Sequence, residues 1–482
     1  MILEPPKDYV PRPYGSLMTR HMVRVPRDAV WAPPGFGKTV TALTALDQVS
    51  FVDDVFPALV LAPVRVARDV WPKEVRKWRH LSKMRVVPVI GTAEDRLWAL
   101  RREAEVYTIN YENLEWLVDL MGDAWPFKTV IADEATRLKG LRMAYKTHPK
   151  TGKVYLSGQG GVRTRALAKV AHAKVKRFIE LTGTPSPNGL QDLWGQMWFL
   201  DAGVRLGRTH DAFKRRWFQK SHDGNNLEAL PFADVQIHDA LRDVCMSLKV
   251  EDWFDIDLPI EKTIYVDLPF KARAQYREME KQMFTEIDGH EIEAFAAAAR
   301  TQKCLQLANG AAYVGDPLAP GERKWVPVHT EKLEALESLL EEAGGMPLLV
   351  SYEFKSDLAR ILAWFKGKAV DIGTAKGMEA FRAGKALIGC GHPASVGHGV
   401  DGLQDVTNIG VFFGHNWNLE TYLQFIERIG PVRQAQSGHK RPVYLYHIVA
   451  RHTVDELVMS RRETKREVQD ILMEAMKCRN DN

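Results

Sequence analysis

Cysteine is scarce in this sequence, and long apolar runs are absent from it. Only four of the 482 residues are cysteines, Cys245, Cys304, Cys390 and Cys478, and their wide spacing predicts neither a disulfide framework nor a paired-thiolate zinc site. No wholly apolar stretch reaches the length that spans a membrane, and no short-period repeat or low-complexity tract occurs. The first residues, MILEPPKDYVPRPYG, lack the basic start and apolar stretch of a secretory signal. We therefore expect a cytoplasmic protein with no membrane partner.

The composition is that of a folded protein with more than one domain. Apolar residues make up 45% and charged residues 26% of the chain, and 482 residues exceed what one ordinary hydrophobic core holds. The net charge of +5 permits a polyanionic partner without requiring one. Basic residues gather in three stretches, at positions 65–79, 163–177 and 205–216. Such stretches are most often solvated helix faces, so they indicate phosphate contacts only beside other evidence.

The first 200 residues alternate short apolar runs with charged segments of helical spacing. This pattern is typical of a parallel sheet wrapped by helices. Ligands bind such open sheets at the carboxyl ends of the strands. The predicted strands are Ala29–Trp31, Ala58–Leu61, Val86–Ile90, Val106–Ile109, Thr129–Ala132 and Phe178–Leu181, and Val66–Trp78 is a predicted helix.

The remainder of the chain predicts a second α/β domain after a short insertion. Residues 201–256 are rich in charge and tryptophan and have helical spacing. We expect a first lobe over residues 1–200, a helical insertion over 201–256, and a second lobe over 257–482. Ala272–Leu307 is expected to be largely helical. Strands of the second lobe are predicted at Lys262–Leu268, Leu348–Tyr352, Ala386–Cys390, Ile409–Phe413 and Val443–Val449.

A glycine-rich segment, Ala32–Thr39, lies between the first predicted strand and a helical stretch. Its sequence is APPGFGKT. Glycines such as Gly35 and Gly37 let backbone N–H groups approach phosphates closely, while Lys38 neutralises the β- and γ-phosphates and Thr39 coordinates Mg²⁺. The segment therefore predicts a site for ATP and Mg²⁺, even though Ala32 stands where the first glycine of this motif is usual.

Two adjacent acids end another predicted strand. Thr129–Ala132 leads directly into Asp133 and Glu134. Adjacent carboxylates at a strand end suit two roles in hydrolysis: Asp133 can hold the Mg²⁺ shell, and Glu134 can polarise the attacking water. Together with the glycine-rich segment, they predict a nucleotide hydrolase.

The order of three segments resembles a known family. APPGFGKT, then VIADEAT, then LTGTPSPNGLQDLW at Leu181–Trp194 are similar to motifs I, II and III of superfamily 2 helicases. The last segment is most similar to Swi/Snf-type remodelling ATPases and their bacteriophage or prokaryotic relatives. The resemblance implies two RecA-like P-loop lobes, with ATP held between them. It also implies DNA contacts at Thr182 and Thr184, and, in two further matching segments, at Pro63, Arg65, Asn110 and Tyr111.

Segments of the second half resemble the later motifs of the same family. Ser351 follows a predicted strand and matches motif IV, and Pro393–Gln404 matches the glycine-rich motif V. The resemblance implies DNA contacts at Ser351, Ser395 and Gly397, and nucleotide contacts at Gly399, Asp401 and Gln424. The segment Glu427–Gln436 resembles motif VI, which supplies arginines to the γ-phosphate. Those arginines stabilise the charge of the transition state.

The sequence departs from the family pattern at three places. Pro431 stands where the second arginine of motif VI is expected; if Gly430–Pro431 is an insertion, the two arginines are Arg428 and Arg433. Gly15 replaces the glutamine that reads adenine, which leaves Tyr14 as the candidate for stacking on the base. Thr136 replaces a histidine after the acids.

These features together predict a DNA-dependent ATPase motor that tracks duplex DNA without sequence preference. Contacts to the phosphate backbone imply that DNA affinity falls steeply with salt. We expect a monomer in the cytoplasm of a bacterial cell or a phage-infected host, working with an accessory protein. Two alternatives stay open: a strand-separating helicase on DNA or RNA, and a nucleotide-switched DNA clamp with little turnover. ATP hydrolysis measured with different nucleic acids distinguishes the three.

Overall fold

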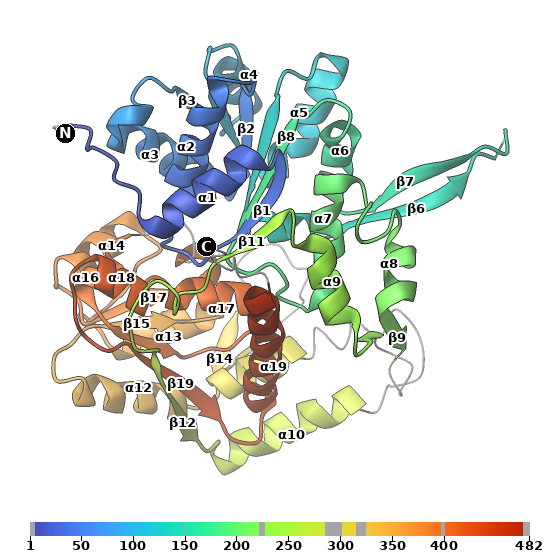
Figure 1. Ribbon diagram of the computed structural model, residues 1–482. Helices are drawn as coiled ribbons and strands as arrows, with labels where there is room; N and C mark the ends of the chain where they lie inside the picture. The colour runs from blue at the N-terminus through green and yellow to red at the C-terminus, as the bar shows by residue number, and fades with distance from the viewer. Residues whose placement is uncertain are drawn as a thin grey trace. The chain divides into compact units, whose positions relative to one another are not determined.

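The chain folds into two compact units, shown in the computed structural model of Figure 1. The structure describes residues 5–149, 151–220, 227–284, 301–314, 324–396 and 401–475. Unit 1 comprises Met1–Phe254 together with Lys465–Asn482, and unit 2 comprises Asp255–Thr464. Each unit has its own sheet and its own hydrophobic core.

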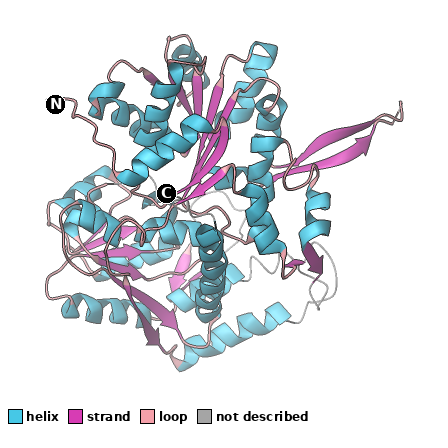
Figure 2. Ribbon diagram, in the orientation of Figure 1, coloured by secondary structure: helices cyan, strands magenta, loops and turns pink. Residues whose placement is uncertain are grey.

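Unit 1 is built on a seven-stranded sheet in which every pair of neighbours is parallel (Figure 2). The strand order is β11-β1-β8-β5-β2-β4-β3. The inner strands are fully buried, which is why β2 and the middle of β5 are continuous apolar runs that do not alternate, whereas β8 also buries Arg177 and Glu180. The strands are β1 (Arg27–Trp31), β2 (Ala58–Ala62), β3 (Val86–Pro88), β4 (Val106–Asn110), β5 (Thr129–Asp133), β8 (Arg177–Thr182) and β11 (Cys245–Ser247).

Helices flank this sheet. One group, α1 to α3, packs together, and a second group is formed by α5, α6 and α7. The predicted helix Val66–Trp78 is confirmed as a short π-helical turn, Val66–Val70, that continues directly into α3. The helices of unit 1 are α1 (Pro13–Arg24), α2 (Lys38–Ser50), α3 (Trp71–Lys77), α4 (Ala93–Leu100), α5 (Leu114–Met121), α6 (Val162–Ala171), α7 (Leu193–Asp201), α8 (His210–Trp217) and α9 (Ala233–Leu241).

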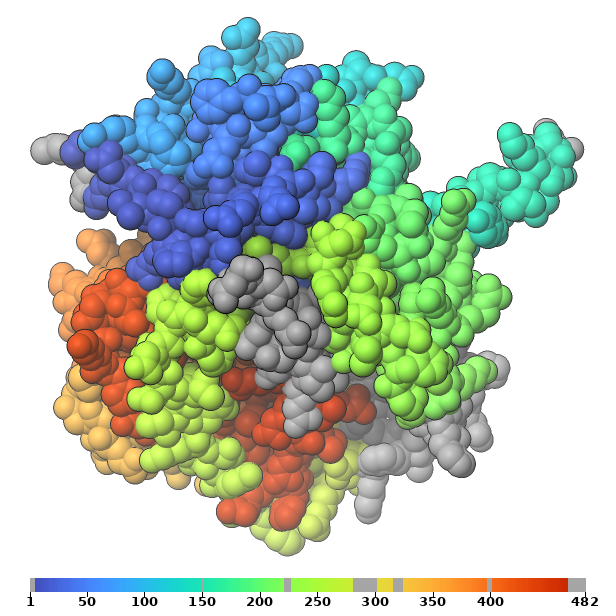
Figure 3. All heavy atoms as spheres, viewed as in Figure 1, coloured from blue at the N-terminus to red at the C-terminus, as the bar shows by residue number. Residues whose placement is uncertain are grey.

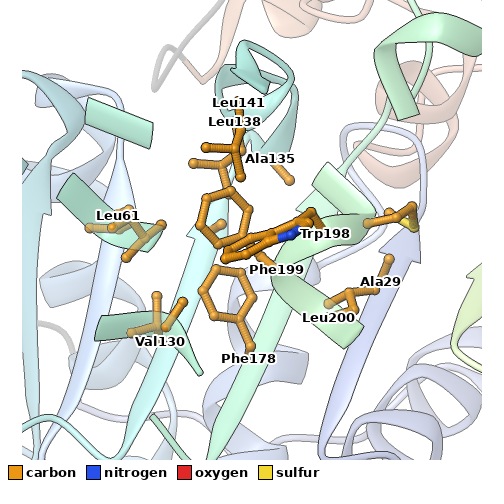
Figure 4. Close-up of a cluster of buried hydrophobic side chains, with 14 of the residues drawn as sticks. Ala29, Leu61, Val130, Ala135, Leu138, Leu141, Phe178, Trp198, Phe199 and Leu200 are labelled. Carbon is orange, nitrogen blue, oxygen red and sulfur yellow. The ribbon is translucent and has the colours of Figure 1, made fainter. Parts of the chain in front are cut away.

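Figure 4 shows part of the core of unit 1, where side chains of the sheet meet α7. Phe178 stacks on Phe199 with ring centroids 5.4 Å apart. Leu138 and Leu141, which follow β5, are completely buried in the same cluster. Burial of such side chains contributes roughly 1.5–3 kcal/mol each. The core therefore anchors the segment that leaves the sheet after the two adjacent acids.

That segment forms an antiparallel hairpin, β6 (Leu141–Thr147) and β7 (Val154–Gly160), which extends away from the body of unit 1 (Figure 1). The sequence pattern did not predict it. A second small hairpin pairs β9 (Phe218–Lys220) with β10 (Leu227–Ala229). Within residues 201–256 the chain thus forms α8, α9, this hairpin and β11, which adds to the edge of the main sheet beside β1.

Unit 2 contains a six-stranded parallel sheet in the order β12-β19-β18-β15-β17-β16. Its strands are β12 (Ile260–Val266), β15 (Leu348–Ser351), β16 (Ala369–Asp371), β17 (Ile388–Gly391), β18 (Ile409–Phe412) and β19 (Tyr444–Ala450), and a separate hairpin pairs β13 (Ala311–Tyr313) with β14 (Trp325–Pro327). Its helices are α10 (Phe270–Phe284), residues 301–309, α12 (Glu331–Glu342), α13 (Lys355–Trp364), α14 (Ala375–Arg382), α15 (Pro393–Val396), α16 (Leu403–Val406), α17 (Leu419–Ile426) and α18 (Pro431–Gln436), with α19 (Val454–Ala475) beginning in this unit.

The two parallel sheets flanked by helices confirm the predicted fold class, two RecA-like lobes. All eleven predicted strands correspond to strands of the structure, with ends that differ by a few residues. The helical prediction for Ala272–Leu307 is confirmed over 272–284 and 301–307, and its middle, 285–300, lies outside the described residues.

Candidate functional site

The loop between β1 and α2 has the geometry of an anion cradle. Gly35 and Gly37 adopt left-handed backbone conformations, with φ of 88° and 72°. Gly37 is the N-cap of α2, and no side chain caps the first turn. The first N–H groups of this helix therefore face the loop without a side-chain acceptor, and the positive end of the helix dipole adds to their attraction for an anion.

Lys38 folds back across this loop. Its Nζ donates to the carbonyl oxygens of Ala32, at 2.7 Å, and Pro33, at 3.3 Å. Lys38 and Thr39 are both half-buried at the start of α2. The amine thus lies over the same concave backbone that would surround a phosphate.

Asp133 ends β5 and points into the protein. It is only 8% exposed, and Trp71 Nε1 donates to its carboxylate at 2.9 Å. Burial raises the pKa of Asp133, while the Trp71 hydrogen bond and the positive charge of Lys38 oppose that rise. Lys38 is therefore close enough to act electrostatically on Asp133, as a shared nucleotide and metal site requires.

Glu134 follows in a strained backbone conformation. Its φ of 65° and ψ of 61° are left-handed, which is uncommon for a residue other than glycine. Its N–H donates to the carbonyl of Leu181, and the hydroxyl of Tyr111 donates to the backbone carbonyls of Asp133 at 3.0 Å and Glu134 at 3.3 Å. Neighbouring strands thus hold the turn that redirects the chain between the two acids. Burial, followed by the charge of Asp133, raises the pKa of Tyr111, which keeps this donor protonated.

The segment Thr182–Thr184 lies directly against the loop Ala32–Thr39, which we call the phosphate loop. Strand β8 is placed between β1 and β5, and Ala32 N–H donates to the Thr182 carbonyl at 3.0 Å. A Cβ on Gly183 would lie 3.1 Å from Pro34 Cδ and 3.4 Å from the Ala32 carbonyl oxygen. The Thr184 N–H donates to Thr182 Oγ1 at 3.0 Å. The sheet of unit 1 therefore brings the three segments with motif resemblance together at its carboxyl edge.

Most of the residues predicted to contact DNA in unit 1 are buried. Pro63, Asn110, Tyr111, Thr182 and Thr184 have little or no exposed surface. Asn110 donates to Glu112 at 2.9 Å. Arg65, immediately before the π-helical turn, is partly exposed. Among these predicted DNA contacts, Arg65 thus has the side chain that a large ligand can reach most easily.

Tyr14, the candidate for stacking on adenine, belongs to an aromatic cluster beside the phosphate loop. It is 6% exposed, and its ring centroid lies 4.6 Å from that of Phe36 and within 6 Å of those of Trp253 and Phe254. Phe36 is itself part of the loop. A Cβ on Gly15 would lie 3.4 Å from the hydroxyl of Tyr9. The hydroxyl of Tyr9 therefore lies next to the position where the family has glutamine.

In unit 2 the candidate arginines lie at the junction of two helices. Arg428 is buried just after α17, and its Nε donates to the backbone carbonyl of Gln424 at 3.3 Å. Gln424 is itself buried. Pro431 is the first residue of α18, a position where its fixed φ and missing N–H cost nothing. The Gly430–Pro431 pair thus separates two helices, which places Arg428 and Arg433 on different elements.

Arg433 forms an ion pair with a predicted nucleotide contact. Its Nη1 lies 2.5 Å from Asp401 Oδ1, and the Asp401 carboxylate is 82% exposed. Ser395 is exposed on α15, whereas Ser351 is completely buried at the end of β15. Gly397 and Gly399 lie outside the described residues. The structure therefore pairs Arg433 with Asp401 and Arg428 with Gln424 in unit 2.

Two contributors to the site of unit 1 escaped the sequence interpretation. Trp71 lies within a predicted helix to which the sequence assigns no function, yet its indole N–H donates to the Asp133 carboxylate. Because Gly183 has no side chain, the Thr182–Thr184 segment can approach the loop that contains Ala32 and Pro34. No sequence signal identifies Trp71, because its partner is 62 residues away. Gly183 could have been found from its place between two threonines at a strand end.

None of the helices in the described part of the chain combines the length and the apolar character that crossing a bilayer requires. A family model, the SNF2-related domain, matches residues 32–151. Solved structures of the Sulfolobus solfataricus SWI2/SNF2 ATPase core, one in complex with dsDNA and one of the core domain, align with 99% and 97% of this chain and with 96% and 92% of their own chains. Their TM-scores are 0.42 and 0.40, and their identities are 19% and 17%.

Among curated proteins, p41 of Acyrthosiphon pisum secondary endosymbiont phage 1 is 51% identical over 478 residues, 98% of this chain and 99% of its own length. The chromatin-remodeling ATPase INO80 of Sclerotinia sclerotiorum is 25% identical over 52% of this chain, and that of Schizosaccharomyces pombe 23% identical over the same share. The matched region is only 14% and 15% of the length of those two relatives. The chain shares its family with the phage protein p41 and belongs to the SNF2-related branch of the superfamily 2 ATPases, in its bacteriophage or prokaryotic form.

Proposed function

We propose that this protein is a DNA-dependent ATPase that uses ATP hydrolysis to translocate along duplex DNA. The observation that carries the proposal is the meeting of three segments at one sheet edge. Strands β1, β8 and β5 are neighbours, and their carboxyl ends bring Lys38, Asp133 and the Thr182–Thr184 segment together. That arrangement couples a phosphate site to a segment whose resemblance implies contact with DNA.

The residues present fit ATP and Mg²⁺. The backbone N–H groups at the start of α2 and the amine of Lys38 match the charge and the size of phosphate groups. Thr39 and Asp133 would hold Mg²⁺, which commonly takes one or two protein oxygens and keeps several waters. Mg²⁺ supplies charge neutralisation at the β- and γ-phosphates.

Each of the remaining residues has one proposed role. Glu134 orients the attacking water. Tyr14 would contact the adenine from the buried aromatic cluster that it forms with Phe36, and Gly35 and Gly37 would lie against the phosphates. From unit 2, Arg428 and Arg433 reach the γ-phosphate in the reactive state, and Asp401, Gln424 and Gly399 complete the nucleotide contacts. Arg433 would exchange its exposed partner Asp401 for phosphate.

The DNA partner is supported by the family. The relatives matched over half of this chain are named chromatin-remodeling ATPases. Arg65 and Ser395 offer exposed or half-exposed contacts, and the buried Pro63, Asn110, Tyr111, Thr182, Thr184 and Ser351 would shape the segments that touch the phosphate backbone, together with Gly397. We further propose a monomer that acts in the cytoplasm of an infected bacterial cell and finds its target through an accessory protein.

The test is ATP turnover with and without duplex DNA, single-stranded DNA and RNA. Duplex DNA is expected to stimulate turnover most, and Lys38→Ala is expected to abolish it because the phosphates lose their main cation. Omission of Mg²⁺ should have the same effect. Equal stimulation by single strands together with strand displacement would favour a helicase, and DNA binding without turnover would favour a clamp. Turnover that stays unchanged with every nucleic acid contradicts the proposal.

A further inference from the structure

The β6–β7 hairpin stands out from unit 1 with both faces of its outer half in solvent (Figure 3). Tyr145 is 58% exposed, and Tyr155 is 44% exposed. The register pairs Tyr145 with Leu156 and Lys146 with Tyr155. Because side chains of successive residues alternate between faces, the two tyrosines lie on opposite faces of the ribbon. We call residues 144–149 and 151–157 the arm.

The arm lies in a stretch without acidic residues. Between Ala135 and Ile179 the sequence has twelve lysines and arginines and no aspartate or glutamate, although the whole chain contains 61 acids in 482 residues. Lys146, Lys153 and Arg165 have no carboxylate partner among the described residues. Such a one-sided charge favours a polyanion as the partner.

Lys146 and Lys153 of the arm share one face. Lys146 pairs across the ribbon with Tyr155, and His148 N–H bonds to the Lys153 carbonyl at the turn. Alternation therefore places Lys146, Lys153 and Tyr155 on the same face, with Tyr145, Val154 and Leu156 on the other. One face thus offers cations to phosphates, and the other offers apolar and aromatic surface to sugars or bases.

The base of the arm is firmly held. Leu141 is completely buried and Met143 is 7% exposed, both in the core of unit 1. A Cβ on Gly160 would lie 2.0 Å from the Gly140 carbonyl oxygen, so the two strands approach closely where the arm leaves the body. At the same end, Glu112 forms ion pairs with Arg137 at 3.4 Å and Arg163 at 3.0 Å. The buried base therefore fixes the direction in which the exposed half of the arm extends.

The arm also originates at the functional edge of the sheet. β5 ends at Asp133, and only the short turn Ala135–Leu138 and three further residues separate it from β6. The chain returns through α6 into β8, which ends at the Thr182–Thr184 segment. The arm is therefore inserted between the hydrolytic acids and the segment that touches the phosphate loop.

We propose that the arm inserts into a groove of duplex DNA and holds the DNA through its phosphate backbone. A two-stranded ribbon fits the major groove, which is about 12 Å wide, and a groove encloses both faces of a ribbon at once. A flat protein surface would cover one face and leave either Tyr145 or Tyr155 in water. The charge of the arm explains attraction to the duplex, and the absence of acids removes repulsion from phosphates. This inference rests on the proposed function, because it names a further surface for the same DNA.

Three variants of the full-length protein test the arm. Replacing residues 145–156 with Asn-Gly joins the cross-strand partners Ala144 and Ser157 by a two-residue turn and leaves the buried base intact. Lys146→Glu with Lys153→Glu reverses the charge of one face, and Tyr145→Ala with Tyr155→Ala removes the rings. Lys83→Glu with Arg101→Glu, two exposed residues that precede β3 and β4, is the matched control.

The readouts are duplex binding by fluorescence anisotropy at several salt concentrations and ATP turnover with and without the duplex. Charge reversal should weaken duplex binding about tenfold or more, and should lower the slope of log affinity against log salt by about two. The shortened arm should do the same, with DNA-free turnover and the control unchanged.

Wild-type turnover that ignores DNA would refute the proposed function. If DNA stimulates the wild type and all three arm variants keep that stimulation and the same duplex affinity, the proposed role of the arm is refuted. Binding of the arm to a protein and not to DNA would also refute it.

Discussion

Gly183 has no room for a side chain, since a Cβ there would lie 3.1 Å from Pro34 Cδ. Contacts this short force the neighbour to move by a few tenths of an ångström. The neighbour in this case is the phosphate loop, whose backbone must match the phosphates closely. Adding one methyl group at Gly183 would therefore disturb the phosphate loop from the Thr182–Thr184 segment.

Gly183→Ala is predicted to raise the KM for ATP by roughly tenfold, because it displaces the cradle from its fitted position. Steady-state ATP hydrolysis checks this. Gly140→Ala is the matched control, since nothing lies within 4 Å of a Cβ at Gly140. Equal KM values for the two variants would show that the phosphate loop adapts freely.

Single residues of the site were partly predictable from the sequence. Lys38, Thr39, Asp133 and Glu134 follow from a loop and a strand end whose local order carries the chemistry. Trp71 was not predictable, because its role depends on a contact between α3 and β5 that only the folded sheet creates. Local motifs thus predict the groups that would touch a ligand, whereas the groups that position them come from tertiary packing.

At the scale of elements, two acids sit inside the sheet of unit 1. Asp28 on β1 and Glu180 on β8 are completely buried, and their carboxylate oxygens have no hydrogen-bond partner among the described residues. Burial raises the pKa of Asp28 well above 3.8, with partial opposition from Arg177, and burial and the charge of Asp28 raise the pKa of Glu180. The native sheet therefore holds protons that the unfolded chain releases.

The sign of the pH dependence follows from these raised values. The native state binds more protons than the unfolded state at pH values between the ordinary and the raised pKa, so the free energy of unfolding falls as pH rises from about 4. Asp28→Asn removes one titrating group and is predicted to make this fall shallower as pH rises above the ordinary pKa of an aspartate. Urea unfolding at several pH values checks it, with the exposed Asp123→Asn as control. An unchanged slope would mean that Asp28 is ionised in the native sheet.

The elements were predictable where burial is uniform. Strands such as β2 and β5 are buried along their whole length, and their continuous apolar sequences show it. The β6–β7 hairpin was missed because its outer half is solvent-exposed, so polar, basic and glycine residues replace the alternation that marks a half-buried strand. The three-residue edge strands β11 and β16 were missed because they are too short to leave a pattern, whereas β3, of the same length, begins a longer apolar run that was predicted.

For the whole molecule, the decisive residues of the proposed reaction come from two units. Lys38 and Asp133 belong to unit 1, and Arg428 and Arg433 belong to unit 2. The division of the chain into lobes at 1–200, 201–256 and 257–482 stays a prediction. Apolar runs in the sequence predicted both sheets, and every matched motif except motif VI, which follows helix α17, lies at or just after the end of a strand.

Arg433→Ala is predicted to lower kcat by about 10³ while leaving ATP affinity nearly unchanged, because the proposed role of the arginine is to stabilise transition-state charge, whereas ground-state binding is proposed for the loop Ala32–Thr39 of unit 1. ATP turnover and equilibrium binding of a fluorescent ATP analogue, measured on the same preparations, separate the two effects. Arg451→Ala is the control, since Arg451 is an exposed residue of unit 2 that contacts Asp267 and the Tyr265 ring. A kcat for Arg433→Ala equal to that of the control would show that unit 2 does not contribute this arginine to hydrolysis. The same comparison on Arg428→Ala would then decide whether either candidate arginine of unit 2 takes part.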